Sequence, residues 1–251
     1  MVWARPVASE NLRTSGGFYG KLCVKFRAMT TYVALKLSHL LLFVYWLGAD
    51  IGVFYSARYV RNRALSTEAR QVAVKIMGWI DQLPRYCLVL MLPVGYTMAR
   101  EIGVVRLPDI FMTVLWVIAL AWLWMVWAIH HWQGTPRAER LRKFDLGWRI
   151  TLALGLLWDA WQGFRGVGHL FADWISIKFL LFAALIFCGI MIRIFGKPIG
   201  PALRQVLSSG STPELEADIA RGFARTRPFV LAIWVLLAVA AWVGITKPVL
   251  G

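Results

Sequence analysis

Long apolar stretches alternate with short polar ones along most of the chain, and this alternation limits the fold more than any other feature. A helix of about 20 apolar residues can cross a bilayer core, because a helix satisfies its own backbone hydrogen bonds. Six stretches approach that length: residues 32–56, 84–104, 108–131, 147–166, 173–195 and 228–248. The sequence therefore predicts an all-α protein, a polytopic transmembrane bundle of about six spans.

The net charge of +15 suggests an anionic partner, and nucleic acid is one candidate. However, the Lys and Arg residues are concentrated between the apolar stretches, where they set membrane topology and contact anionic lipid. The expected partner is therefore the lipid bilayer, and no nucleic acid. The most basic segments, at residues 58–85, 137–149 and 193–227, follow the first, third and fifth stretches. We expect these segments in the cytoplasm and both termini outside, in the cytoplasmic (inner) membrane of a bacterium.

The beginning of the chain differs from the rest. Residues 1–28 are polar and basic and lack the apolar core of a signal peptide. We expect a basic N-terminal arm over residues 1–28, which is either an interfacial segment or untranslated sequence before a start at Met29. A single transmembrane bundle domain follows over residues 29–251. The three cysteines are isolated, so no disulfide framework is expected.

Several weaker signals lie between the spans. Residues 147–166 form the weakest span, because Arg149, Asp159 and Arg165 interrupt it. Residues between Gly196 and Ser211 resemble a loop, since Gly, Pro and Ser recur there. Short amphipathic surface helices are expected at two places: residues 66–82, capped by Ser66 or Thr67, and residues 212–225, capped by Thr212.

Ionisable side chains inside the first span predict a functional face. At 100° per residue one stripe of this helix contains Tyr32, Lys36, His39, Phe43, Trp46 and Asp50. Ionisable groups in hydrocarbon are costly, so they usually face a bundle interior and mark a pathway or a cofactor site. We therefore expect an imidazole, an ammonium, a carboxylate and aromatic rings to face the interior together.

His39 and Lys178 are the strongest candidates for a site. A helical histidine can ligate the iron of haem b; the alternative is a hydrogen bond to a neighbouring helix or a proton relay. Lys178, just inside the fifth span, either extends to the headgroups or binds an anionic group such as a haem propionate. We expect the first and fifth spans to be neighbours, with both side chains facing a shared interior.

Other histidines and an acid carry weaker predictions. His130 and His131 end the third span beside tryptophans, as in an aromatic belt, and His169 lies in a glycine-rich turn. Asp159 either pairs with a cation, with Lys36, Arg165 and Lys178 as the candidates, or marks a span that is not fully inserted.

Four motifs occur in order along the chain: Leu35-Lys36-Leu37-Ser38-His39 with Trp46-Leu47-Gly48, Met91-Leu92-Pro93, Trp174-Ile175-Ser176-Ile177-Lys178-Phe179, and Arg227-Pro228 to Thr246-Lys247-Pro248. Together they resemble the HemJ-type protoporphyrinogen oxidase family over about half of the chain, and the CopD-like copper-resistance membrane proteins have a similar opening. Residues 104–170 have no clear counterpart in the HemJ-type bundle.

This resemblance implies a cofactor and an activity. The first-helix histidine of the family is taken to ligate haem b, so the resemblance assigns the iron to His39, with Trp46 on the same face. It implies that Lys178 is functionally important; with Lys36 it would neutralise propionates, and Asp50 would accept a proton. The implied reaction is the oxidation of protoporphyrinogen IX to protoporphyrin IX, with electrons passed to quinone or another respiratory partner.

Two other functions remain open from the sequence. A CopD-like copper or metal permease would use His39, Asp50 and Met91 as ion ligands. A non-catalytic membrane subunit, alone or as a homo-oligomer, would use the same polar groups to join helices.

Overall fold

The computed structural model describes residues 11–249 of the chain, with side chains from Thr30 onward. The regular elements of these residues are all α-helical, which confirms the predicted class. The helices are α1 (Asn11–Val60), α2 (Thr67–Ile80), α3 (Gln82–Glu101), α4 (Asp109–His131), α5 (Pro136–Phe164), α6 (Asp173–Phe195), α7 (Ile199–Ser209) and α8 (Pro213–Thr246).

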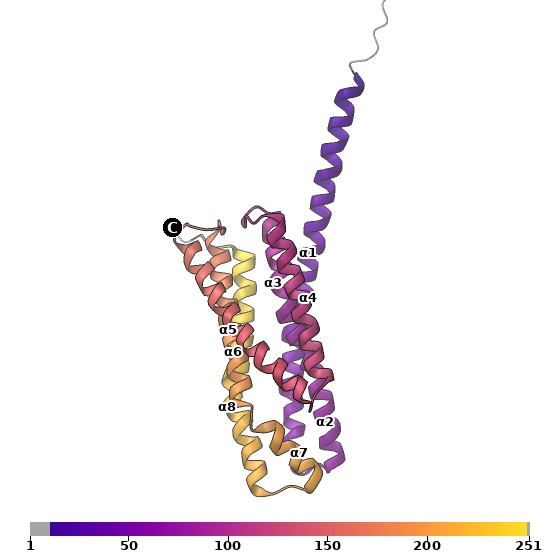
Figure 1. The fold of residues 1–251 in the computed structure, drawn as a ribbon, viewed down its shortest axis with the longest axis vertical. Helices are drawn as coiled ribbons and strands as arrows, with labels where there is room; N and C mark the ends of the chain where they lie inside the picture. The colour runs from indigo at the N-terminus through magenta and orange to yellow at the C-terminus, as the bar shows by residue number, and fades with distance from the viewer. Residues whose placement is uncertain (1–10, 250–251) are drawn as a thin grey trace, which may run out of the picture.

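The long helices form two groups. In the first group α3 packs against α1 and α4, and in the second α6 packs against α5 and α8. Figure 1 shows these helices side by side along the long axis, with α7 at one end and the chain terminus at the other. We call the end that contains α7 the basic end of the bundle. The opposite end, where the chain terminates, is the C-terminal end.

Among the residues with described side chains, four helices are long and apolar enough to cross a membrane: α1 over Thr30–Val60, α4, α6 and α8. The protein is therefore an integral membrane protein by the length and composition of its helices. α3 and α5 are as long as a bilayer is thick, but their polar residues lower their hydropathy. Several of those residues are buried, including Gln82 of α3 and Asp145 and Arg149 of α5.

A small second core lies at the basic end. It consists of Val60, Ala202, Leu203, Val206 and Ile219, from α1, α7 and α8. The expected loop between Gly196 and Ser211 was therefore wrong, because α7 occupies most of it. The expected helix at residues 212–225 is present but continues without a break into the last span.

The predicted helix caps are confirmed. The Ser66 hydroxyl accepts a hydrogen bond from the Ala69 N–H at 3.3 Å, and the Thr212 hydroxyl accepts one from Leu215 at 3.4 Å. Each satisfies a backbone donor that the first turn of a helix leaves free.

One charged side chain of α2 is buried while several apolar ones are exposed. Val72, Ile76 and Trp79 are exposed, whereas Arg70 is buried. The Arg70 guanidinium donates to both carboxylate oxygens of Glu216 in α8, at 2.6 and 3.2 Å, and its Nε donates to the Val60 carbonyl at 3.0 Å. This ion pair fixes α2 against α1 and α8 at the basic end.

Residues 11–28 of the predicted N-terminal arm continue α1, which extends past the other helices at the C-terminal end (Figure 1). Residues 1–10 lie outside the described residues.

The two groups are tied together at the C-terminal end by their loops. The loop after α3 and the loop after α5 form an isolated antiparallel bridge between Val105 and Leu170. The Arg106 N–H donates to the His169 carbonyl at 3.0 Å, and the Phe171 N–H donates to the Val104 carbonyl at 2.9 Å. These bonds fix the backbone of His169 against the other half of the bundle.

Candidate functional site

His39 lies in the interface between α1 and α3. A Cβ on Gly95 of α3 would be 3.3 Å from Cε1 of the His39 ring, so the imidazole contacts the α3 backbone where a side chain is missing. The ring is half-buried, and its Nδ1 has no hydrogen-bond partner among the described residues. A buried imidazole nitrogen without a partner is available to a ligand or a metal.

Lys178 of α6 lies against α8, in the other group of helices from His39. Its Nζ is 2.6 Å from where a Cβ of Gly244 in α8 would be, so the ammonium occupies space left by that glycine. Lys178 is half-buried, and its charge acts on His39. The side chain therefore turns toward the interior and α8, and the structure brings it into electrostatic range of His39.

The rest of the predicted α1 stripe is only partly interior. Trp46 is buried, and its ring meets Phe182 of α6 edge-on, with centroids 6.2 Å apart. This side-chain contact joins α1 to α6. Among the described residues the backbones of the two helices do not come close, contrary to the expectation that the first and fifth spans are neighbours. Lys36 is exposed, so the structure does not bring it to His39.

The sequence did not predict a second cluster that lies beside His39 and Lys178. The Tyr96 hydroxyl of α3 donates to Asp159 of α5 at 3.2 Å, and His169 Nε2 lies 3.7 Å from the same carboxylate oxygen. The Tyr96 ring also stacks on the His169 ring and contacts Phe179, the residue after Lys178. Asp159 thus accepts a hydrogen bond from a phenol rather than pairing with the expected lysine or arginine, and the nearby His169 Nε2 makes no hydrogen bond among the described residues.

These groups lie at one depth. Tyr96, Asp159 and Lys178 each lie five residues from the nearest end of their helix, which is a depth of about 7.5 Å. His39 reaches the same level, because it contacts the residue before Tyr96. Two imidazoles, a phenol, a carboxylate and an ammonium therefore form a polar layer inside the C-terminal end, which could bind a cofactor or move protons.

Asp50 belongs to a different region. It lies within electrostatic range of Asp81 and Arg85, which form an ion pair at the junction of α2 and α3, and its Oδ2 is buried without a hydrogen-bond partner. Asp50 is 11 positions after His39 on the same helix, or about 16 Å along the axis. The structure therefore separates Asp50 from the polar layer.

A buried charge network near Asp50 was also not predicted. Asp145 is only 1% exposed and accepts hydrogen bonds from Trp122 at 2.7 Å, Arg149 at 3.1 Å and Arg193 at 2.7 Å. The four-residue spacing of Asp145 and Arg149 was the one available signal, since such pairs meet on a helix. This network joins α4, α5 and α6 near the basic end.

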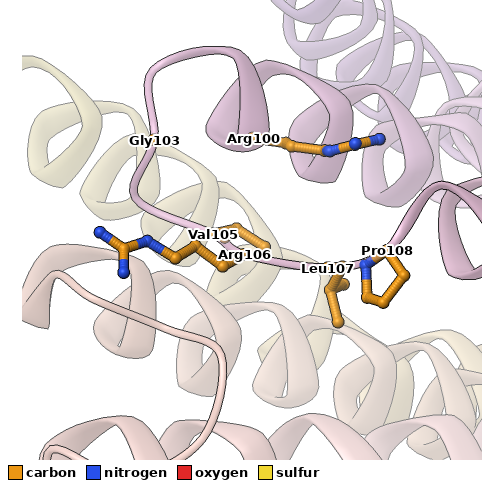
Figure 2. Close-up of a pocket in the computed structure, with 6 residues that line it drawn as sticks. All are labelled: Arg100, Gly103, Val105, Arg106, Leu107 and Pro108. Carbon is orange, nitrogen blue, oxygen red and sulfur yellow. The ribbon is translucent and has the colours of Figure 1, made fainter.

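Two surface pockets lie away from His39. The first, of about 410 Å³, is lined by Arg100, Gly103, Val105, Arg106, Leu107 and Pro108. Figure 2 shows the Arg100 and Arg106 side chains pointing in different directions, and the Arg106 guanidinium lies over the Phe171 ring at 4.5 Å. The second, of about 450 Å³, is lined by Tyr86, Leu90, Leu120, Leu123, Trp124 and Trp127.

The remaining histidines lie at the end of α4. His130 meets the Trp79 ring edge-on and contacts Gln133 through Nδ1, and His131 stacks on Trp127. Among residues with described side chains, no group of three or more His, Cys, Asp or Glu is arranged to hold a metal ion.

Comparisons of this chain with protein-family models, curated proteins and solved structures gave no match.

Proposed function

We propose that this protein is a haem-b membrane protein related to the HemJ type, and that it oxidises protoporphyrinogen IX to protoporphyrin IX. The observation that carries the proposal is the half-buried His39, whose Nδ1 lacks a partner and whose ring faces Gly95 within range of Lys178. A haem brings four nitrogen ligands of its own, so one or two imidazoles are enough to hold it. The free Nδ1 of His39 and the nearby Lys178 charge support such a group at this site.

Each residue has a separate role in this proposal. His39 would hold the iron of a bound haem, and Lys178 would pair with one of the haem carboxylates, because a desolvated carboxylate needs a cation. Trp46 closes the apolar side next to Phe182. A bound haem supplies one-electron redox chemistry. Lys36 is exposed, so we assign it to the outer edge of the haem site. Asp50 lies apart from the polar layer, so we assign it to proton uptake from the basic end.

The proposal includes six membrane crossings and an orientation. α3 and α5 lie beside the four apolar helices and run between the same two ends (Figure 1). Six crossings leave both termini on one side, and the positive-inside rule assigns the basic end to the cytoplasm of a bacterial inner membrane. Both termini are then outside.

Quinone is the electron acceptor that best fits the apolar pocket on the surface of α3 and α4. The 450 Å³ pocket between α3 and α4 is lined by leucines, tryptophans and Tyr86, so a flat apolar ring can lie in it. The experiment is an anaerobic assay of purified protein with protoporphyrinogen IX and a quinone, read as porphyrin fluorescence. We expect activity in the wild type and a loss in Lys178→Ala. Lys197→Ala, which removes an exposed lysine, is the matched control.

Equal activity in Lys178→Ala and Lys197→Ala would remove Lys178 from the mechanism. Haem-free wild-type protein that stays inactive after haem is added would overturn the proposal.

A further inference from the structure

Four helices bring arginines together at the basic end, and this cluster has no role in the proposed redox site. The Arg193 side chain of α6 donates to the Arg142 carbonyl of α5 at 3.5 Å. Arg142 is also within electrostatic range of Arg85 from α3, Arg193 and Arg204 from α7. We call Arg85, Arg142, Arg193 and Arg204 the arginine cluster.

Two members of the cluster already have carboxylate partners. Arg85 pairs with Asp81, and Arg193 pairs with Asp145, which Arg149 also contacts. Asp50 and His130 face Arg85 from α1 and α4, and Glu139 acts on Arg142 from one turn earlier in α5. The carboxylates around the cluster are therefore largely committed to Arg85, Arg149 and Arg193.

Arg142 and Arg204 differ from the other two. Both are exposed, and neither has a carboxylate within ion-pair distance among the described residues. Arg142 precedes the membrane-crossing part of α5. Partial burial of the Arg142 side chain lowers its pKa, repulsion from the other three guanidiniums lowers it further, and Glu139 raises it. Arg142 and Arg204 thus lie close to two other arginines, and no carboxylate among the described residues forms an ion pair with either of them.

We propose that the arginine cluster binds an anionic phosphate group, as on a phosphatidylglycerol headgroup. One guanidinium group can donate two parallel hydrogen bonds to two oxygens of the same phosphate, because its planar N–H donors match the spacing of those oxygens. Basic sites between transmembrane helices near a membrane surface suit lipid headgroups. Arg85 lies in the first turn of α3 and Arg193 in the last turn of α6, so the cluster lies where the helices meet the headgroups.

The test is native mass spectrometry of delipidated protein in a neutral detergent. The probes are dioleoyl-phosphatidylglycerol, dioleoyl-phosphatidylcholine and inorganic phosphate. We expect wild-type protein to bind phosphatidylglycerol more tightly than the zwitterionic lipid. Arg142→Gln with Arg204→Gln should weaken this binding by about tenfold or more, the loss expected for a charge-assisted hydrogen bond.

The matched control is Arg137→Gln with Arg225→Gln, which removes the same charge from exposed arginines that do not act on Arg142. It should leave binding unchanged. Displacement of the lipid by inorganic phosphate would identify a soluble phosphate as the ligand, and no displacement would identify the lipid headgroup. If the cluster variant does not fold, Arg204→Gln alone replaces it. An equal loss in the control, or equal binding of the two lipids, would overturn the proposal.

Discussion

Replacing Glu216 by alanine should test how the basic end is held together. Arg70 and Glu216 are each about 3% exposed, and the carboxylate also accepts a hydrogen bond from Ser211 at 2.7 Å. Removing one partner of a buried pair leaves the other charge without compensation, which costs about 3–5 kcal/mol. For a chain of this size that loss lowers the thermal unfolding midpoint by about 6–20 °C.

The assay is thermal unfolding in detergent, followed by far-ultraviolet circular dichroism. Glu214→Ala removes an exposed acid from the same helical turn and should leave the midpoint nearly unchanged. Arg70→Met combined with Glu216→Leu should recover much of the loss, because an apolar pair of similar volume replaces the two charges. Equal midpoints for Glu216→Ala and Glu214→Ala would refute the reasoning.

The ion pair of Arg70 and Glu216 also predicts that the stability of the fold depends on pH. Burial opposes ionisation of Glu216, but hydrogen bonds from Arg70 and Ser211 and the charges of Arg70 and Arg63 outweigh it, so the pKa of Glu216 lies below its ordinary value of 4.5. The stabilisation is therefore complete above that ordinary value and is lost as the pH falls through the lowered pKa. Wild-type protein should lose more stability on acidification than Glu216→Gln.

Three further predictions concern other parts of the bundle. A reporter fused after Arg204 should be cytoplasmic and one fused after Gly251 external; a cytoplasmic signal from both would mean an even number of crossings between them. Gly95→Ala places a methyl group 3.3 Å from the facing imidazole and should alter the absorbance of bound haem, whereas Gly48→Ala meets no atom within 4 Å and should leave it unchanged. Asp145→Ala leaves two arginines unpaired and should cost about 3–5 kcal/mol in a thermal unfolding assay; a shift no larger than that of an exposed acid would count against the network.

Local signals in the sequence predicted local structure well. The apolar lengths predicted the long helices, and Ser66 and Thr212 predicted where two helices begin. α7 was missed because Gly200 and Pro201 favour a loop, yet proline is tolerated in the first turn of a helix. The contacts of α7 with α2 and α8, which bury Ala202, Leu203 and Val206, decide the outcome.

Partners distant in the sequence were not predictable. Arg70 and Glu216 are 146 positions apart, and Tyr96 and Asp159 are 63 apart. A periodicity argument gives the face of a helix but not its neighbour, so it placed Asp50 with His39 although the residues differ in depth. The same argument placed Lys36 in the interior. Lys36 is exposed because few other helices surround α1 at that residue, and no local pattern in the sequence indicates this.

The central claim is tested most directly by the absorbance spectrum of purified wild-type and His39→Ala protein, expressed with ample haem. We expect a Soret band that shifts on reduction in the wild type. His39→Ala should lack the band at equal abundance in the membrane, and His131→Ala, which changes an exposed ring stacked on Trp127, should retain it. A wild-type protein without a Soret band, or an unchanged band in His39→Ala, would contradict the assignment of His39 as the haem ligand.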